Sequence, residues 1–211
     1  GIDFHRYNAS SFFGVAYENV SKSLRTLAKP VNHGANYNMG AYVLIQQMGG
    51  ELEVLKAGKL LGLPSNYTAE KIAVHLLKSF DKTYPKIRHN YHNYVKMKVL
   101  TTKKLVGATG WTRYCFGDPN KNKLDLNSYV AHNPQSLNAM ILNKAFLKVF
   151  YNIWWNNPQD LTLNAQIHDS ILFQYKKGRD DLADDLAKEM VMPIQVTDIE
   201  GVTREMVVPV D

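Results

Sequence analysis

Apolar side chains in the first part of the chain recur at the spacing of α-helices. Leu24, Leu27 and Val31 follow Ser21, a residue type that caps helix N-termini. The apolar residues between Ala69 and Phe80 also lie mostly on one helical face. The pattern therefore predicts a helix that begins after Ser21 and another helix over residues 69–80.

The pattern changes after residue 105. Residues 106–116 alternate and contain two glycines, which predicts a hairpin followed by a turn at 117–120. Apolar residues from Leu137 to Trp154 then return to helical spacing, and Asn156-Asn157-Pro158 should end that helix.

The last sixty or so residues mix both patterns. Residues 161–167 and 171–175 are short β-prone runs, residues 180–190 form an acidic helical pattern, and residues 202–210 are β-prone again. A helical part followed by a mixed part predicts an α+β fold, which we divide into residues 1–120 and 121–211.

Composition narrows the class of protein. The chain has 211 residues, of which 45% are hydrophobic and 21% charged, which excludes a disordered or collagen-like chain. Its single cysteine, Cys115, excludes an internal disulfide and a cysteine-rich zinc site. No apolar stretch approaches the ~20 residues of a membrane span. We expect no membrane partner and a cytoplasmic location.

The net charge of +6 favours a polyanionic partner such as nucleic acid, although many basic proteins bind none. Seven Lys or Arg residues, three tyrosines and no acidic residue lie between Lys82 and Leu105. This run, which includes Lys96 and Lys98, fits a surface for phosphates and unpaired bases. It fits a solvated amphipathic helix equally well.

Arg25, Lys29, His33 and Tyr37 follow one another at intervals of four residues. On a helix this interval produces one gently winding stripe, with two cations at one end and two rings at the other. Cations suit a triphosphate, and rings suit a sugar and a base. The spacing alone also fits a solvated basic helix face, and Pro30 disfavours a straight helix.

A second candidate is the segment His168-Asp169-Ser170 between the two β-prone runs. Asp and Ser are common in tight turns, where they bond their own backbone. A carboxylate at a hairpin tip is also a rigid place to hold a divalent cation.

Taken together, these segments resemble family A DNA polymerases, the bacterial DNA polymerase I class. The stripe is similar to the fingers helix that binds the incoming dNTP, and His168-Asp169 to the palm turn that holds a catalytic carboxylate. Residues 3–13 are similar to the segment before the fingers helix, residues 105–113 to the family's hairpin, and Pro134-Gln135-Ser136 to a primer-template contact.

The resemblance implies a role for each matching residue. Lys29 and Arg25 would bind the triphosphate, His33 would pack on the sugar and Tyr37 would lie by the nascent base pair. Lys29 would also donate a proton to the leaving pyrophosphate. The DNA contacts would be Gln135, Asn133 and Arg113, and the basic run adds Lys96 and Lys98 as further candidates.

The palm residues follow in the same way. Asp169 would be one of two carboxylates that hold two Mg²⁺ ions, and His168 would help to place the primer terminus. Three positions depart from the family pattern. Ser170 replaces a Glu, Asn38 replaces a Gly, and Ala131 stands where an Asn is expected.

In the family, the other catalytic aspartate, the thumb and the exonuclease domain precede the segment that matches residues 3–13. The resemblance thus assigns residues 1–120 to the fingers with their hairpin and residues 121–211 to the C-terminal part of the palm. We expect a second polypeptide or a further N-terminal portion to supply the rest, and little activity without it. A longer chain from which this one is cut fits equally well.

Two other functions stay open. A phage-type single-subunit RNA polymerase shares the Arg/Lys…Tyr helix and a His-Asp-Ser turn, which Ser170 favours. A non-catalytic DNA-binding subunit of polymerase-like shape is the other. The divergent positions His33, Asn38 and Ser170 suggest a bacteriophage source, hence the cytoplasm of a host cell. For the polymerase, we expect the cationic stripe and Asp169 to form opposite walls of one cleft.

Overall fold

The computed structural model describes residues 3–208. The chain divides into two compact units. The first contains residues 1–103 and 116–130, and the second contains residues 104–115 and 131–211. This division differs from the expected one at residue 120, because the hairpin at 104–115 groups with the C-terminal part. The assignment of fingers and palm stays a prediction.

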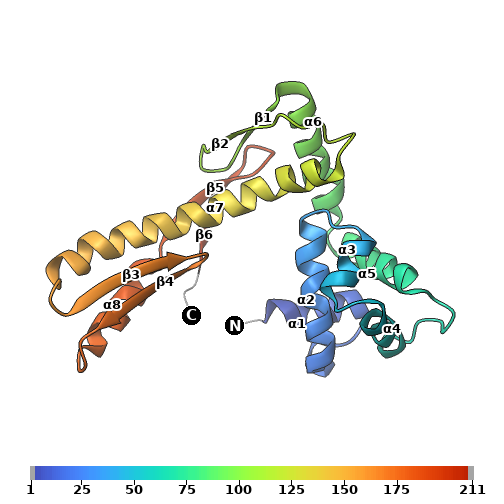
Figure 1. The fold of residues 1–211 in the computed structure, drawn as a ribbon, viewed down its shortest axis with the longest axis horizontal. Coiled ribbons are helices and arrows are strands. Elements are labelled where there is room, and N and C mark those ends of the chain that lie inside the picture. Colours follow the sequence, from blue (N-terminus) through green and yellow to red (C-terminus); the bar gives the residue numbers. More distant parts are fainter. Residues whose placement is uncertain (1–2, 209–211) are drawn as a thin grey trace. The chain divides into compact units, whose positions relative to one another are not determined.

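The first unit is helical. Its helices are α1 (Phe4–Phe13), α2 (Lys22–Asn36), α3 (Ala41–Gln47), α4 (Glu51–Leu60), α5 (Ala69–Thr83) and α6 (Asn93–Thr102), with a 3-10 turn at Tyr17–Asn19 and a π-helical turn at Ile87–His92. The first turns of α7 (Lys123–Asn152) also belong to it. Figure 1 shows α1 to α5 in blue to teal around a common core.

Local chemistry explains where these helices begin. The Ser21 hydroxyl accepts a hydrogen bond from the Leu24 N–H at 3.2 Å, and the Thr68 hydroxyl accepts one from the Lys71 N–H at 3.3 Å. Such N-caps satisfy backbone donors that lack a partner within the helix. The buried faces of α2 and α5 meet in the core, and both predicted helices are confirmed.

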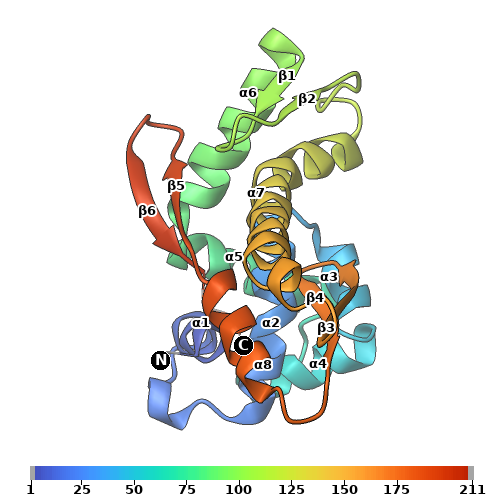
Figure 2. The same cartoon turned by 90° about the vertical axis from the view of Figure 1, so that its left-hand side faces the viewer.

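The second unit contains β1 (Lys104–Val106), β2 (Thr112–Tyr114), the rest of α7, a 3-10 turn at Trp154–Asn156, β3 (Leu161–Ile167), β4 (Ser170–Tyr175), α8 (Asp180–Met190), β5 (Pro193–Thr197) and β6 (Thr203–Val207). Within residues 3–208 the strands form three separate two-stranded antiparallel sheets. Figure 2 shows the β5–β6 hairpin, in red, apart from β3 and β4. The α+β prediction is confirmed.

Two elements differ from the sequence-based expectation. Helix α7 begins at Lys123 and continues through Pro134, whereas the apolar pattern predicts it only from Leu137. No pattern in the sequence predicts strand β5, which pairs with β6 from Pro193↔Val207 to Thr197↔Thr203. In the described part of the chain, no helix has both the length and the apolar content needed to cross a membrane.

Candidate functional site

Helix α2 carries the predicted cationic stripe on its solvent side. Ala28, Val31 and Ala35 on its other side are fully buried. Lys29 and His33 are exposed and Arg25 is half-buried, while Tyr37 is the C-cap residue at the end of the helix. The helix is continuous through Pro30. The first unit thus presents the stripe from a helix whose opposite face is firmly packed.

Residues near the start of the chain complete this site. The Asp3 carboxylate caps α1 by accepting from the Arg6 N–H at 3.0 Å, and its other oxygen lies 2.7 Å from Arg25 Nε. The Arg25 guanidinium lowers the pKa of the Asp3 carboxyl. The His5 ring lies 5.7 Å, centroid to centroid, from the ring of His33. Asp3 and His5 therefore contact two members of the stripe.

His5 is a candidate site residue that the sequence analysis did not single out. Burial lowers the pKa of His5, and the nearby cations Arg25 and Lys29 lower it further, as does the neighbouring His33. In the sequence, the resemblance of residues 3–13 to the segment before the fingers helix is the feature that could have indicated His5. The effect of these cations on His5 shows that positive charge is concentrated here, which favours an anionic ligand.

The end of α2 is held by packing and by two polar contacts. A Cβ on Gly34 would lie 2.5 Å from the Met39 sulfur, so Met39 fills the space that glycine leaves. Asn38 has φ +59°, a left-handed conformation that Gly and Asn adopt more readily than other residues. The side-chain amides of Asn38 and Asn127 lie 3.0 Å apart.

The π-helical turn at Ile87–His92 joins α2 to the start of α7. Tyr91 Oη donates to the Val130 carbonyl at 2.7 Å, and His92 Nε2 lies 2.9 Å from the Asn36 carbonyl. Burial raises the pKa of Tyr91, with smaller contributions from Tyr37 and Tyr94. Tyr37 therefore lies near Tyr91, whose hydroxyl is hydrogen-bonded within the first unit.

The basic run at 82–104 is only partly a free surface. Tyr84 donates to Asn8 and packs on Phe12 and Phe80, and Tyr91 is bonded as described. Tyr84 and Tyr91 are therefore engaged within the first unit, and both interpretations of the run stay predictions. Lys98 lies over the Tyr94 ring at 5.8 Å. Lys96 and Lys98 are two residues apart on α6, so they point to different sides.

In the second unit, Asp169 lies at the turn between β3 and β4. The pair Ile167↔Ser170 closes a two-residue turn in which His168 has φ +52°. The Ser170 hydroxyl donates to the Ile167 carbonyl at 2.9 Å, so it has a local structural role. His168, Asp169 and Ser170 are all exposed.

Asp169 can contribute one ligand to a metal ion. Among the described residues, no three His, Cys, Asp or Glu side chains gather closely enough to form a metal site. Mg²⁺ is commonly held by one or two carboxylates together with substrate phosphates and water. The chemistry of Asp169 fits such a ligand.

The β1–β2 hairpin packs against α7 near the remaining predicted DNA contacts. A Cβ on Gly107 would lie 3.1 Å from Ser136 Oγ and 3.6 Å from Asn133 Oδ1, so a larger residue would require Ser136 to move slightly. Burial lowers the pKa of His132, and Arg113 acts in the same direction. Arg113 and Asn133 are thus brought to one region of the second unit, where Gln135 is exposed.

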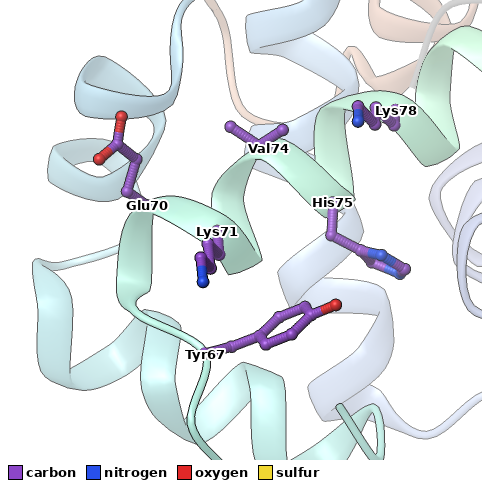
Figure 3. A pocket seen from close by; sticks show the side chains of 6 residues that line it. All are labelled: Tyr67, Glu70, Lys71, Val74, His75 and Lys78. Atoms are coloured by element: carbon purple, nitrogen blue, oxygen red, sulfur yellow. The ribbon is translucent and has the colours of Figure 1, made fainter. Parts of the chain in front are cut away.

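A separate depression of about 390 Å³ lies on the solvent side of α5. Figure 3 shows its lining, which consists of Tyr67, Glu70, Lys71, Val74, His75 and Lys78. Lys71 Nζ lies 5.9 Å from the centre of the Tyr67 ring. None of these residues belongs to the predicted site.

Comparison with known proteins agrees with this fold. The family model described as DNA polymerase family A matches residues 1–203. The thermostable DNA polymerase I of Thermus thermophilus is 26% identical over 208 residues, which cover 93% of this chain and 22% of that protein. The DNA polymerase I of Helicobacter pylori is 26% identical over 209 residues, which cover 93% of this chain and 20% of that protein.

A solved structure shows the same fold. It is the POL domain of Pol1 from M. smegmatis in complex with DNA primer-template and dNTP, with a TM-score of 0.68 and 19% identity. The match covers 89% of this chain and 30% of that one. The chain spans about a fifth of the length of the curated relatives above. Because the family model covers nearly all its residues, the chain belongs to DNA polymerase family A.

Proposed function

We propose that this chain provides the nucleotide-binding fingers and one palm carboxylate of an enzyme for template-directed DNA synthesis. The enzyme would add dNTPs to a primer 3′-hydroxyl. The main support is that a chain of this family carries Arg25, Lys29 and His33 along one face of α2, with Asp3 and His5 in contact with that face.

The stripe is suited to a nucleoside triphosphate. Arg25 and Lys29 bind the phosphates, and Lys29 also donates a proton to the leaving pyrophosphate. Arg25 exchanges the Asp3 carboxylate for a phosphate oxygen, since their contact is solvent-accessible. His33 packs on the sugar, and Tyr37 lies next to the nascent base pair.

Asp169 acts as one carboxylate ligand in a site for two Mg²⁺ ions. When bound, the ions lower the pKa of the primer 3′-hydroxyl and neutralise charge on the phosphates. Asp169 offers two oxygens at an exposed turn, where substrate phosphates and a second carboxylate have access. His168, next to it, contacts the primer terminus.

The primer-template contacts come from several elements. Arg113, Asn133 and Gln135 lie where the β1–β2 hairpin meets α7, and they supply donors and acceptors for DNA. Lys96 and Lys98 on α6 are suited to phosphates. Because they point to different sides of the helix, we expect each to contact a different part of the DNA.

The remainder of the enzyme provides the other palm carboxylate, the thumb and, where proofreading occurs, a 3′–5′ exonuclease. The curated relatives are several times longer than the chain. These parts belong either to the same polypeptide or to a second one, and synthesis requires them. A bacteriophage source and the host cytoplasm remain predictions.

Primer extension by the complete polymerase tests this function. We expect dNTPs to be incorporated in preference to NTPs, and Lys29→Ala to slow incorporation strongly. Lys59→Ala on α4 is the matched control, since Lys59 is another exposed lysine of the first unit. Equal extension by the two variants, or a preference for NTPs, would contradict the proposal.

A further inference from the structure

One face of helix α5 carries a row of basic side chains. Lys71, His75, Lys78 and Lys82 follow one another at intervals of three or four residues, so they lie on the same side of the helix. All four are exposed. The opposite side is buried in the core of the first unit, through Ile72, Ala73, Leu76, Leu77 and Phe80. Together with Tyr67, the four basic residues form what we call the α5 row, and the packed core holds its helix in place.

The Tyr67 ring lies at the start of this row. Tyr67 is half-buried and precedes α5, and Lys71 Nζ lies 5.9 Å from the centre of its ring. Figure 3 shows the ring on the same side of α5 as His75, whereas Glu70 points to the other side. These side chains line the depression of about 390 Å³, and proteins bind small organic groups in pockets of about 300–1,000 Å³. The depression therefore has room for one nucleotide unit.

Neighbouring acids do not neutralise the α5 row. The Asp81 carboxylate, on the same helix, is 2.9 Å from Arg88 Nε and is therefore already paired. In the described part of the chain, the three lysines of the row form no ion pair. Glu70 is the acidic residue among those that line the depression. The excess of positive charge favours a ligand that carries several negative charges.

Single-stranded DNA has the chemistry that fits this row. Its phosphates suit the lysines, and an unpaired base can stack on an aromatic ring such as that of Tyr67. The bases of a duplex are already paired and stacked on one another. From Lys71 to Lys82 the row extends about 16 Å along α5, which is the length of a few nucleotides. An acidic polypeptide would match the charges but would leave the ring without a role.

The α5 row is separate from the cationic stripe on α2. Both helices direct their buried faces into the same core, so their exposed faces point away from it in different directions. A strand on α5 is therefore not the nucleotide held at Arg25 and Lys29. In template-directed synthesis, the template ahead of the primer terminus is single-stranded, so this strand is available to a second site on the same unit.

We propose that the α5 row binds the unpaired template strand several nucleotides ahead of the primer terminus. Lys71 and Lys78 contact its phosphates, and one base stacks on Tyr67. The inference rests on the proposed function because it needs a template, but it concerns a site that takes no part in nucleotide addition. A template held in this way is kept from pairing with itself before it is copied.

The length of the template overhang tests the inference in the complete polymerase. Fluorescence anisotropy gives the Kd for a primer-template duplex with a single unpaired template nucleotide and for the same duplex with a long overhang. We expect the long overhang to bind the wild type more tightly. The double variant Lys71→Ala, Lys78→Ala should lose most of this gain. The salt dependence of the long overhang, as the slope of log K against log salt, should decrease by about 0.7 per lysine.

Further variants separate charge from stacking. Tyr67→Ala should weaken binding of the long overhang about tenfold and leave the salt dependence unchanged, whereas Tyr67→Phe should retain the wild-type affinity. The double variant Lys56→Ala, Lys59→Ala on α4 is the matched control, because it removes two exposed lysines from the same unit. Every variant should copy the single unpaired nucleotide at the wild-type rate, which also shows that it is folded.

Several results would overturn the inference. An equal gain for the wild type and the Lys71→Ala, Lys78→Ala variant would show that the α5 row does not hold the template, and the proposed function would stand. A gain that appears only when a displaced strand is present would assign the row to that strand. Poly-L-glutamate binding that this variant loses, with overhang binding unchanged, would assign it to an acidic polypeptide. A wild type that copies not even a single unpaired nucleotide would contradict the proposed function and this inference with it.

Discussion

The two candidate sites differ in how firmly the protein holds them. The stripe lies on α2, where Ala28, Val31 and Ala35 are completely buried in the core of the first unit. Asp169 lies at the tip of a two-stranded sheet, and every residue of β4 is at least partly exposed. A helix packed on one face holds its side chains accurately, whereas a hairpin needs further strands or helices for stability.

One face of the β3–β4 hairpin is nevertheless supported. Leu161 packs with Val149 of α7, with Ile153 directly after α7, and with Leu182 and Leu186 of α8. This support lies toward the base of the hairpin, because Leu161 pairs with Tyr175 at the end remote from the turn. We infer that the stripe is held in place by the core of the first unit, while the position of Asp169 depends more on what binds next to it.

The strongest test concerns the carboxylate of the second unit. Asp169→Asn should reduce DNA synthesis by roughly a thousandfold, because a metal ion contributes several kcal/mol of transition-state stabilisation. Primer-template affinity should stay near the wild-type value, which a gel-shift assay measures. Asp184→Asn is the control, since Asp184 is an exposed aspartate on α8. Unchanged synthesis by Asp169→Asn would make Asp169 structural.

The next test concerns the stripe itself. Lys29→Ala should lower kcat/KM for dNTP by about a hundredfold, since one charged donor to a developing negative charge contributes on this scale. Lys29→Arg should recover part of the loss because it retains the positive charge. Steady-state kinetics of single-nucleotide insertion measure both. If Lys29→Arg is as impaired as Lys29→Ala, proton donation matters more than charge.

The next test concerns the packing of Met39 against Gly34 at the end of α2. Gly34→Ala should lower the free energy of unfolding by at most about 1–2 kcal/mol, because the added methyl overlaps the flexible end of Met39, while the helix gains from alanine. The double variant with Met39→Ala should recover much of that loss. Urea denaturation measures both. A Gly34→Ala variant as stable as the wild type would show that Met39 moves without cost.

The smallest expected effect is on how the stability of the protein depends on pH. Burial lowers the pKa of His92, and this outweighs the opposing effect of its contact with the Asn36 carbonyl. Below about pH 6.5 the unfolded chain thus binds more protons than the folded one. Stability is therefore full above that pH and falls as the pH decreases, by at most about 1.4 kcal/mol per pH unit for this residue.

His92→Gln removes the titrating group, so its stability should depend less on pH between 5 and 7. Thermal unfolding across this range measures the difference. Since burial also lowers the pKa of His5 and His132, some acid sensitivity should remain. A wild type that is equally stable at pH 5 and pH 7 would argue against a buried, neutral His92.

Some features were missed for local reasons. The apolar spacing predicts α7 only from Leu137, whereas the helix begins at Lys123 and includes Pro134. Strand β5 begins with Pro193. A strand can accept proline at its first position, but proline in a sequence does not usually indicate a strand. Both elements depend on packing partners that lie outside the local sequence.

The sequence by itself determined the local features. It specified the cap at Ser21, the bounds of α8, the turn at His168-Asp169 and the residue types of the stripe, because these depend on neighbours within a few positions. The tertiary structure alone decided which distant side chains meet. Asp3 with Arg25 and His5 with His33 are such contacts. They depend on how α1 packs against α2, which no spacing along the chain encodes.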